Sequence, residues 1–350
     1  MVISVKRLTE IMYPTIKDVA AEAKVSIATV SLVVNNNERI SQDTRKKVLK
    51  AIKKLNYRPS RSARGLVSRK TGNIGFILTE EHFLLTEPFY TRIFLGTEFE
   101  ARKNDYYVLL STIASSFKVG DQLPRFISER NVDGIIVSGK VPDSFTESIS
   151  KYNIPLVFID FSPALRDYPN VLTDNLKGGI LATEHLIKNG HKNIAFIGGE
   201  ISHPSIMERL RGYKLALERA AINTNGELVM TNDEYLSRQN GYNSVKKIFK
   251  LKKKITAIFA ANDATAFGVM QFLKENNYNI PNDISLVGFD DVEADLIIDP
   301  PLTTVKVPKL EMGIEAVQLL LNMIKSNNGV AKKIVIPVEL IVRESTKKIN

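Results

Sequence analysis

Several polar side chains stand directly after short apolar runs of this sequence. Asp160 follows LVFI, Asn262 and Asp263 follow AIFAA, and Asp290 follows SLVGF. We expect Arg209 to begin a helix in the string ERLRGY, after a glycine-rich loop. Carboxylate, amide and guanidinium groups hydrogen-bond hydroxyls with defined geometry, so this set suits a polyhydroxylated ligand.

Two neighbouring aromatic residues add a flat apolar surface to this set. Phe89 and Tyr90 stand at the head of an expected helix and could stack on the face of a sugar or a base. Structural roles remain open for three of these residues. Phe89 could belong to the core, Asp290 could be a turn residue, and Asp263 is better explained as a helix cap.

The sequence offers no catalytic or metal-binding motif. The four histidines (His82, His185, His191, His203) lack metal-ligand spacing, and there is no GxSxG, P-loop or GxGxxG after a strand. Without cysteine, disulfides, thiolate metal sites and a cysteine nucleophile are excluded. We expect a protein that is not an enzyme and needs no cofactor or metal.

The segments that must position these residues alternate between two patterns after Gly72. Short β-branched or aromatic runs are expected to be strands at 73–78, 106–111, 134–137, 156–159, 193–198, 257–260 and 285–288, and also at 302–305 and 335–342. Amphipathic segments at 94–103, 178–189, 209–221 and 264–276 are expected helices. This alternation predicts an α/β fold with parallel sheets.

Residues 73–350 are too many for one comfortable core, so we expect two lobes. The first would comprise about 73–160 plus 303–332, and the second about 161–302 plus 333–350. Ligands of open α/β sheets bind beyond the carboxyl ends of the strands. The expected ligand site is therefore a cleft between the lobes, which would unite Asp160, Arg209, Asn262 and Asp290 with Phe89 and Tyr90.

The excess positive charge is confined to the first fifth of the chain. Residues 1–72 hold sixteen Lys and Arg against five Asp and Glu, a balance of +11, whereas the remaining residues balance at −1. A solvated basic face would explain a single charge run. An asymmetry this sharp instead indicates a polyanion as partner of the first segment.

The same segment carries a helix-turn-helix pattern in residues 14–58. TIKDVAAEAKVSIATVSLVVNN begins with Thr15 and Asp18 in capping-box spacing, and Ser26 can cap a second helix to about residue 35. Ser41 can cap a third helix to about residue 55. Two short helices, a tight turn and a closing helix form an all-α helix-turn-helix headpiece.

The second helix divides into two faces. At about 100° per residue, Val30, Val33 and Val34 favour the core, which would expose Ile27, Ala28 and Leu32; the opposite division stays open. Exposed apolar side chains can contact thymine methyl groups in the major groove. Further candidates are either caps or contacts to phosphate and base: Lys17, Ser26, Thr29 and Asn35.

Residues 59–72, after the headpiece, form a basic hinge without a core pattern. RPSRSARGLVSRKTG is either a plain tether or a helix that forms only on DNA, with Leu66 as an apolar wedge between base steps. Gly65 lowers the helix propensity here, which favours folding coupled to binding.

The headpiece run and NYRPSRSARGL behind it resemble the LacI/GalR family of bacterial transcriptional regulators, and the resemblance continues from NIGFIL to VRES. It implies a two-lobed periplasmic-binding-protein-like effector domain, a homodimer on a palindromic operator, and an effector that is commonly a sugar. It also implies that Leu66 intercalates with Ala63 and Arg64 beside it, and that bases are read at Ile27, Ala28 and Leu32. Several family members have polar or aromatic residues there, so the operator sequence stays open. The predicted DNA-contacting set is Thr15, Lys17, Ser26, Ile27, Ala28, Thr29, Ser31, Leu32, Asn35, Tyr57, Ala63, Arg64 and Leu66.

The first residues lack the apolar core of a secretory signal, and no run of about 18 apolar residues occurs. We expect a soluble, cytoplasmic protein whose residues 1–13 are a disordered extension, with Met12 as an alternative start. The α/β part alone would also suit a transporter's solute-binding protein or a sugar-modifying enzyme. The basic headpiece argues against the first, and the missing catalytic motif against the second.

Overall fold

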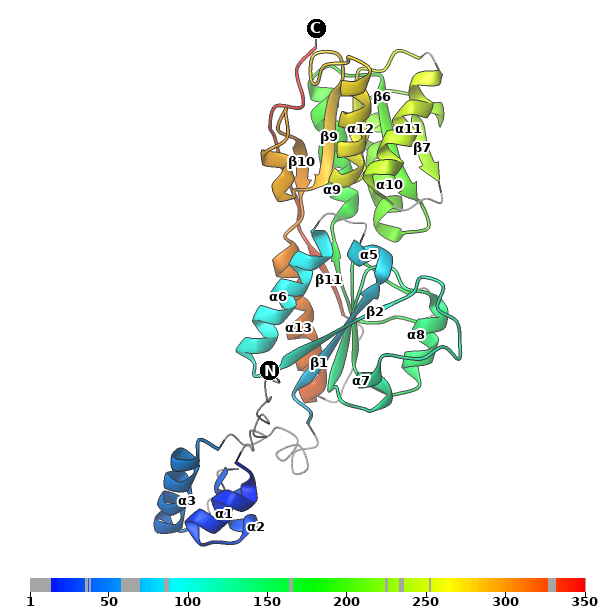
Figure 1. The fold of residues 1–350 in the computed structure, drawn as a ribbon. Helices are drawn as coiled ribbons and strands as arrows, with labels where there is room; N and C mark the ends of the chain where they lie inside the picture. Colours follow the sequence, from blue (N-terminus) through cyan, green and yellow to red (C-terminus); the bar gives the residue numbers. More distant parts are fainter. Residues whose placement is uncertain are drawn as a thin grey trace, which may run out of the picture. The chain divides into compact units, whose positions relative to one another are not determined.

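The computed structural model describes residues 14–34, 37, 39–57, 70–84, 88–163, 166–223, 226–232, 236–251, 253–326 and 332–349. The chain divides into two compact units, Met1–Gly72 and Asn73–Asn350 (Figure 1). The predicted extension 1–13 and most of the predicted hinge lie outside the described residues.

The first unit contains the three predicted helices, α1 (Ile16–Ala23), α2 (Ile27–Val34) and α3 (Gln42–Leu55). Thr15 and Asp18 form the predicted capping box: Thr15 N donates to Asp18 Oδ2 at 2.7 Å, and Asp18 N donates to Thr15 Oγ1 at 3.4 Å. Ser41 caps α3 by accepting a hydrogen bond from Thr44 N. These caps satisfy amide groups that the helix itself leaves unpaired.

A small apolar core holds the three helices together. On α2 the valine side faces inward, as predicted, since Val30 and Val33 are 0% and 4% exposed. Ile27 and Leu32 on the other side are 45% and 39% exposed. The core consists of Val19, Ala20, Ala23, Val30, Val33, Val48, Ala51 and Tyr57.

In its described residues the second unit has two sheets of six strands each, with helices on both faces (Figure 1). In the first sheet the order is β11-β5-β4-β3-β1-β2, and all pairs are parallel. This sheet defines lobe 1. Its strands are β1 (Asn73–Thr79), β2 (Tyr107–Ile113), β3 (Gly134–Ser138), β4 (Leu156–Ile159), β5 (Asn170–Thr173) and β11 (Lys333–Ile336), and its helices are α5 (Glu80–Leu84), α6 (Phe89–Lys103), α7 (Arg125–Ser128), α8 (Asp143–Ser150) and α13 (Lys309–Ser326).

Lobe 2 is defined by the second sheet, in the order β12-β10-β9-β8-β6-β7. Only the edge strand β12 pairs antiparallel in this sheet, among the described residues. Its strands are β6 (Ile194–Glu200), β7 (Val229–Asn232), β8 (Ala257–Ala260), β9 (Ser285–Asp290), β10 (Thr303–Lys306) and β12 (Glu339–Ile341), and its helices are α9 (Asn175–Lys188), α10 (Pro204–Arg219), α11 (Arg238–Lys250) and α12 (Asp263–Glu275), with the 3-10 turns η1 (Gly226–Leu228) and η2 (Glu293–Leu296).

In lobe 1, helices α6 and α13 pack together on one face of the sheet, while α7 and α8 cover the other. Close approach of α6 and α13 depends on glycine. A Cβ at Gly96 would lie 2.1 Å from the Leu310 carbonyl oxygen, and one at Gly313 would lie 2.2 Å from the Ile93 carbonyl oxygen. Only glycine permits this helix spacing without a shift of backbone.

The predicted division between the lobes was wrong at three places. The strand at 170–173 pairs with β4 and β11 in lobe 1, whereas the prediction from sequence places it in the second lobe. The strand at 303–306 pairs with β9 and β12 in lobe 2, whereas the following α13 belongs to lobe 1. The run 335–342 is two strands in different sheets, because Pro337 removes a ladder donor and the chain crosses between lobes there.

Candidate functional site

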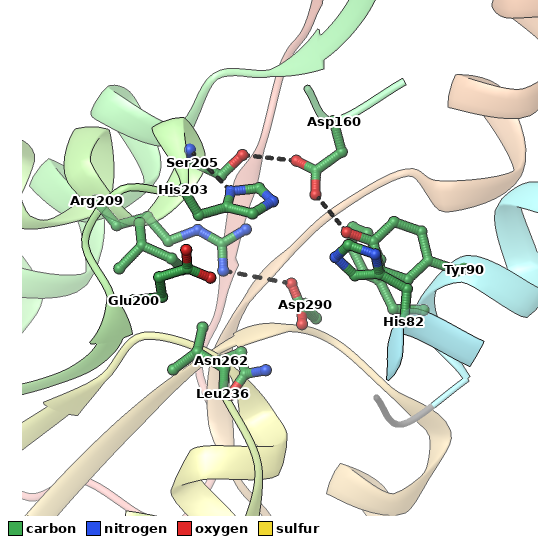
Figure 2. Close-up of a pocket in the computed structure, with 12 residues that line it drawn as sticks. His82, Tyr90, Asp160, Glu200, His203, Ser205, Arg209, Leu236, Asn262 and Asp290 are labelled. Atoms are coloured by element: carbon green, nitrogen blue, oxygen red, sulfur yellow. Dashed lines mark hydrogen bonds and ion pairs between the residues drawn. The ribbon is translucent and has the colours of Figure 1, made fainter. Parts of the chain in front are cut away.

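A pocket lies between the two lobes, at the carboxyl ends of their strands (Figure 2). All six residues predicted for the ligand site line it together: Phe89, Tyr90, Asp160, Arg209, Asn262 and Asp290. Sequence reasoning missed six others: His82, Glu200, His203, Ser205, Ile206 and Leu236. Glu200 is the last residue of β6 and His203 follows it, so the rule that selected Asp160 and Asp290 could have found them.

The fold delivers these side chains from the points where strands end. Asp160 directly follows β4, Asp290 is the last residue of β9, and Asn262 caps α12 by accepting a hydrogen bond from Thr265 N at 2.9 Å. Phe89 and Tyr90 begin α6, as predicted. Arg209 does not begin its helix, because α10 starts at Pro204 and Arg209 lies in its second turn.

Arg209 is fully enclosed, with 3% of its surface exposed. Its Nε donates to Asn175 Oδ1 at 2.8 Å, and its Nη1 donates to the Ala261 carbonyl oxygen at 2.6 Å. The guanidinium lies 3.6 Å from the centre of the Phe289 ring. This combination of hydrogen bonds and stacking fixes the plane of the guanidinium in the pocket wall.

Asp290 lies beside Arg209 in the pocket wall. Arg209 Nη1 is 3.7 Å from Asp290 Oδ1, close enough for Coulomb attraction but too long for a hydrogen bond (Figure 2). Burial raises the pKa of Asp290 to about 8, against the opposing charge of Arg209. Asp290 is 7% exposed, and Oδ1 has no hydrogen-bond partner among the described residues. A buried oxygen without a hydrogen-bond partner lowers the stability of the fold unless a ligand supplies the missing hydrogen bond.

Asp160 links the two lobes inside the pocket. Its Oδ2 accepts a hydrogen bond from the Tyr90 hydroxyl of lobe 1 at 3.0 Å, and its Oδ1 accepts one from Ser205 Oγ of lobe 2 at 2.7 Å (Figure 2). The side chain is 4% exposed. The hydrogen bond between Ser205 and Asp160 therefore requires closed lobes, because separation of the lobes would break it.

Two uncharged histidines complete the wall. His82 Nδ1 lies 2.6 Å from Thr79 Oγ1, and the His82 ring packs edge-on to Tyr90. Burial, with unfavourable electrostatic interactions with His203 and Lys140, lowers the pKa of His82 to about 3. Burial likewise lowers the pKa of His203. Neutral imidazoles offer one donor and one acceptor each, which suits hydroxyl groups.

The predicted DNA-contacting residues of the headpiece divide by exposure. The exposed ones are Thr15, Lys17, Ser26, Ile27, Ala28 and Leu32, whereas Thr29 and Ser31 are half-buried. Tyr57 is 8% exposed and belongs to the core, so its ring supports the headpiece rather than presenting a contact surface. Asn35, Ala63, Arg64 and Leu66 lie outside the described residues.

Comparison with known proteins identifies both parts of the chain. Residues 15–60 match the model of bacterial regulatory proteins, lacI family, and residues 183–346 match that of a periplasmic binding protein-like domain. The transcriptional repressor PurR of Vibrio vulnificus is 33% identical over 338 residues, covering 96% of this chain and 99% of that protein. The chain belongs to the lacI family of bacterial regulatory proteins.

Other members of the lacI family are similar to this chain over almost its full length. The transcriptional regulator RegA of Clostridium saccharobutylicum is 35% identical over 96% of this chain and 100% of its own. The lac repressor dimer bound to operator and the anti-inducer ONPF superposes with a TM-score of 0.80 at 28% identity, covering 96% of this chain and 100% of that one. The regulator CelR in complex with cellobiose has a TM-score of 0.72 at 29% identity, covering 95% and 99%.

This lacI-family member is thus a DNA-binding transcriptional regulator with a two-lobed effector domain. The relatives are transcriptional regulators rather than enzymes. Within the described ranges, no helix is long and apolar enough to span a bilayer. The same ranges contain no group of three or more His, Asp or Glu arranged to hold a metal ion.

Proposed function

We propose that this regulator is a repressor that binds a palindromic operator as a homodimer, and that a small polyhydroxylated effector, a sugar, controls it from the interlobe pocket. The observation that carries the effector assignment is the pocket itself. It joins one fixed guanidinium, hydrogen-bonded carboxyls, two neutral imidazoles and two aromatic rings at the junction of two lobes.

The unpaired Asp290 Oδ1 supports a hydroxyl-bearing ligand in particular. A sugar hydroxyl beside this pair would accept a hydrogen bond from Arg209 and donate one to the buried Asp290 oxygen. Phe89 and Tyr90, each 5% exposed, could cover the apolar face of a sugar ring. The structure of the related CelR with cellobiose is consistent with this ligand class.

DNA contact through the exposed side of α2 follows from the split of that helix. Three apolar residues of this side are exposed: Ile27, Ala28 and Leu32. Their burial would stabilise the headpiece, so their exposure favours a role in binding. An exposed apolar strip on a recognition helix fits thymine methyl groups in the major groove. Lys17 and Ser26 are exposed beside it for phosphate contact, and Leu66 of the hinge is proposed to wedge into the minor groove with Ala63 and Arg64 beside it.

Exposed apolar residues on the effector domain support the homodimer. Leu296 and Ile297 are 62% and 86% exposed at the end of η2, and Phe99 on α6 is 46% exposed. Arg92 of α6 forms an ion pair with Glu293 of η2, so these two elements are neighbours across the lobes. Exposed apolar side chains on η2 and α6, one element from each lobe, suit contact with a second copy of the chain.

In the mechanism we propose, the effector shifts the balance between open and closed lobes. Because the surface around η2 and α6 draws on both lobes, closure would change how two copies pack, and thereby the spacing of their hinges. The DNA affinity then follows through linkage between the two sites.

A thermal-shift screen of neutral sugars, followed by operator binding, tests the proposal. A ligand that binds only the folded state stabilises it, by about 2.7 kcal/mol at a concentration of 100 Kd. This stabilisation raises the apparent melting temperature. The operator would first be selected from random DNA. The expected result is a sugar that both raises Tm and changes operator affinity. If sugars raise no Tm while operator binding is intact, the effector class is wrong and the DNA function stands.

A further inference from the structure

An ion pair joins the two lobes at the edge of the pocket. Lys140 lies in the loop after β3 of lobe 1, and Glu200 is the last residue of β6 in lobe 2. Their side chains form an ion pair. Lys140 Nζ also donates to Ser202 Oγ at 2.8 Å, and Ser202 Oγ donates to Glu200 Oε1. The three side chains thus form a small hydrogen-bonded cluster across the junction between the lobes.

This cluster is more shielded from solvent than the ion pairs on the helix surfaces. The Lys140 and Glu200 side chains are each 32% exposed, against 80% and 51% for Arg125 and Glu129 on α7. Exposed pairs contribute little, whereas partly buried ones are screened less by salt. Burial acts to raise the pKa of Glu200, but hydrogen bonds from Lys140 and Ser202 outweigh it and lower that pKa.

Backbone geometry holds Lys140 in this position. Gly139 has φ +77°, a left-handed turn, and its N–H donates to the Ile159 carbonyl oxygen at 2.8 Å. A Cβ at Gly139 would lie 2.9 Å from both His82 Cε1 and the Tyr90 hydroxyl. The Lys140 loop therefore rests on the wall of the pocket, and Glu200 is itself part of that wall.

The second interlobe ion pair lies on the other side of the lobe 1 sheet. Arg92 belongs to α6, which packs on one face, while Lys140 leads into α8, which packs on the opposite face. The Arg92 and Glu293 side chains are 39% and 64% exposed, so this pair is the weaker of the two. The Lys140 cluster therefore opposes opening of the lobes on the α8 side, together with the hydrogen bond from Ser205 to Asp160 inside the pocket.

We propose that Lys140, Glu200 and Ser202 form a latch that holds the two lobes closed over the pocket. Lys140 is a positioning residue in this latch: its ammonium group draws Glu200 and Ser202 of lobe 2 onto lobe 1. Opening would separate the opposite charges and leave each to water. That the latch influences the response to the effector rests on the proposed function. The existence of the latch does not.

Site-directed spin labelling tests the latch, because the chain contains no cysteine. One cysteine is placed on α8 (Glu147→Cys) and one on α11 (Lys246→Cys), both at exposed positions in different lobes. Double electron–electron resonance then measures the distance between labels, with excess unlabelled protein so that only pairs within one chain contribute. The full chain is used without DNA or sugar.

The expected result is a dominant short distance in the parent protein at low salt. Lys140→Gln should lower the ratio of closed to open lobes by roughly tenfold, the effect of losing one partly buried charge pair. Added salt should lengthen the distance in the parent and leave the variant unchanged. The exchanged pair Lys140→Glu with Glu200→Lys should restore the short distance, which a merely structural role of either residue would not predict.

The matched control is Arg125→Gln, which removes an ion pair within lobe 1. It should leave the distance distribution as in the parent. An unchanged distribution in Lys140→Gln, or equal opening in Arg125→Gln, would overturn the latch. Because neither sugar nor operator is in the sample, such a result is separate from any failure of the effector assignment.

Discussion

Arg209 faces Asp290 at 3.7 Å but directs its hydrogen bonds elsewhere, to Asn175 and to the Ala261 carbonyl oxygen. The guanidinium is thus held by lobe 2 itself and needs no ligand to keep its place. Asp290 Oδ1, in contrast, has no hydrogen-bond partner among the described residues. The pair combines a fixed donor with an unsatisfied acceptor, which is the arrangement that a ligand hydroxyl can complete.

Arg209→Ala should abolish the response of operator binding to the effector while operator binding itself persists. Removal of Arg209 leaves Asn175 Oδ1 and the Ala261 carbonyl without their donor, so we also expect a loss of about 2–4 kcal/mol in stability. Operator titrations with and without the sugar found by thermal shift would measure the response. Arg211→Ala is the matched control, since Arg211 is 69% exposed on the same helix. A normal dose response in Arg209→Ala would remove Arg209 from the site.

His82 should make stability depend on pH in a defined window. Burial lowers the pKa of His82 to about 3 in the folded protein, below the ordinary value of 6.5. The unfolded chain takes up a proton below pH 6.5 and the folded protein does not, so this contribution is present above pH 6.5 and is lost as the pH falls toward 3. The slope is about 1.4 kcal/mol per pH unit.

His82→Asn removes that titration and keeps a polar partner for Thr79. Urea unfolding at pH 7 and pH 5.5 should show the parent losing about 1.4 kcal/mol relative to the variant. The comparison with the variant cancels the other titrating groups. Parallel pH profiles for the two proteins would mean that His82 titrates normally.

Gly139→Ala should damage the pocket and the latch together. The position has φ +77°, and a Cβ there would lie 2.9 Å from His82 and Tyr90 in the pocket wall. We expect a loss of about 1–3 kcal/mol in stability from backbone strain and crowding, with weaker effector binding. Gly120→Ala is the control for strain alone, because it shares a positive φ of 101° and no atom lies within 4 Å of its Cβ. Equal effects of the two changes would show that crowding of the pocket wall is unimportant.

The sequence predicted most strands because their apolar runs are buried on both faces, as in β3, β4 and β8. It missed β5 and β7, whose four residues each carry too few apolar side chains to form a pattern. The lobe boundaries were wrong because pairing decides them. Strand 303–306 and helix 309–326 are neighbours in the sequence but belong to different lobes.

The pocket was partly predictable for a related reason. Asp160 and Asp290 follow strands, and the ends of parallel strands meet at one edge. His82 lies in the short helix α5, where it packs on Tyr90 of the same lobe, and Leu236 lies in a loop, so neither follows directly on a strand end. No local sequence pattern marks these two residues as part of the pocket. The same holds for Lys140, whose role depends on Glu200 in the other lobe.

Leu66→Ala should weaken specific DNA binding much more than nonspecific binding. A wedge between base steps acts only where the hinge engages the operator centre, whereas a phosphate contact acts on any sequence. Lys17→Ala should accordingly weaken both kinds of binding and reduce the salt dependence by about one unit of slope. Fluorescence anisotropy on the operator and on random DNA measures both. Equal losses of affinity for the two DNAs in Leu66→Ala would contradict the role of Leu66 as a wedge between base steps.

Leu32→Ala should separate DNA recognition from headpiece stability. Leu32 is 39% exposed on α2, so its truncation leaves no buried cavity and should change stability by less than about 0.5 kcal/mol. If its side chain contacts thymine methyl groups, operator affinity should fall roughly tenfold, with a smaller loss when the contacted thymine is replaced by uracil. Leu49→Ala on α3, where Leu49 is 51% exposed, is the matched control and should leave operator affinity unchanged. Val33→Ala, at a side chain only 4% exposed, should instead lower stability by about 1–2 kcal/mol. The reverse outcome, a stability loss in Leu32→Ala with no change in sequence preference, would place the contact surface on another face of α2.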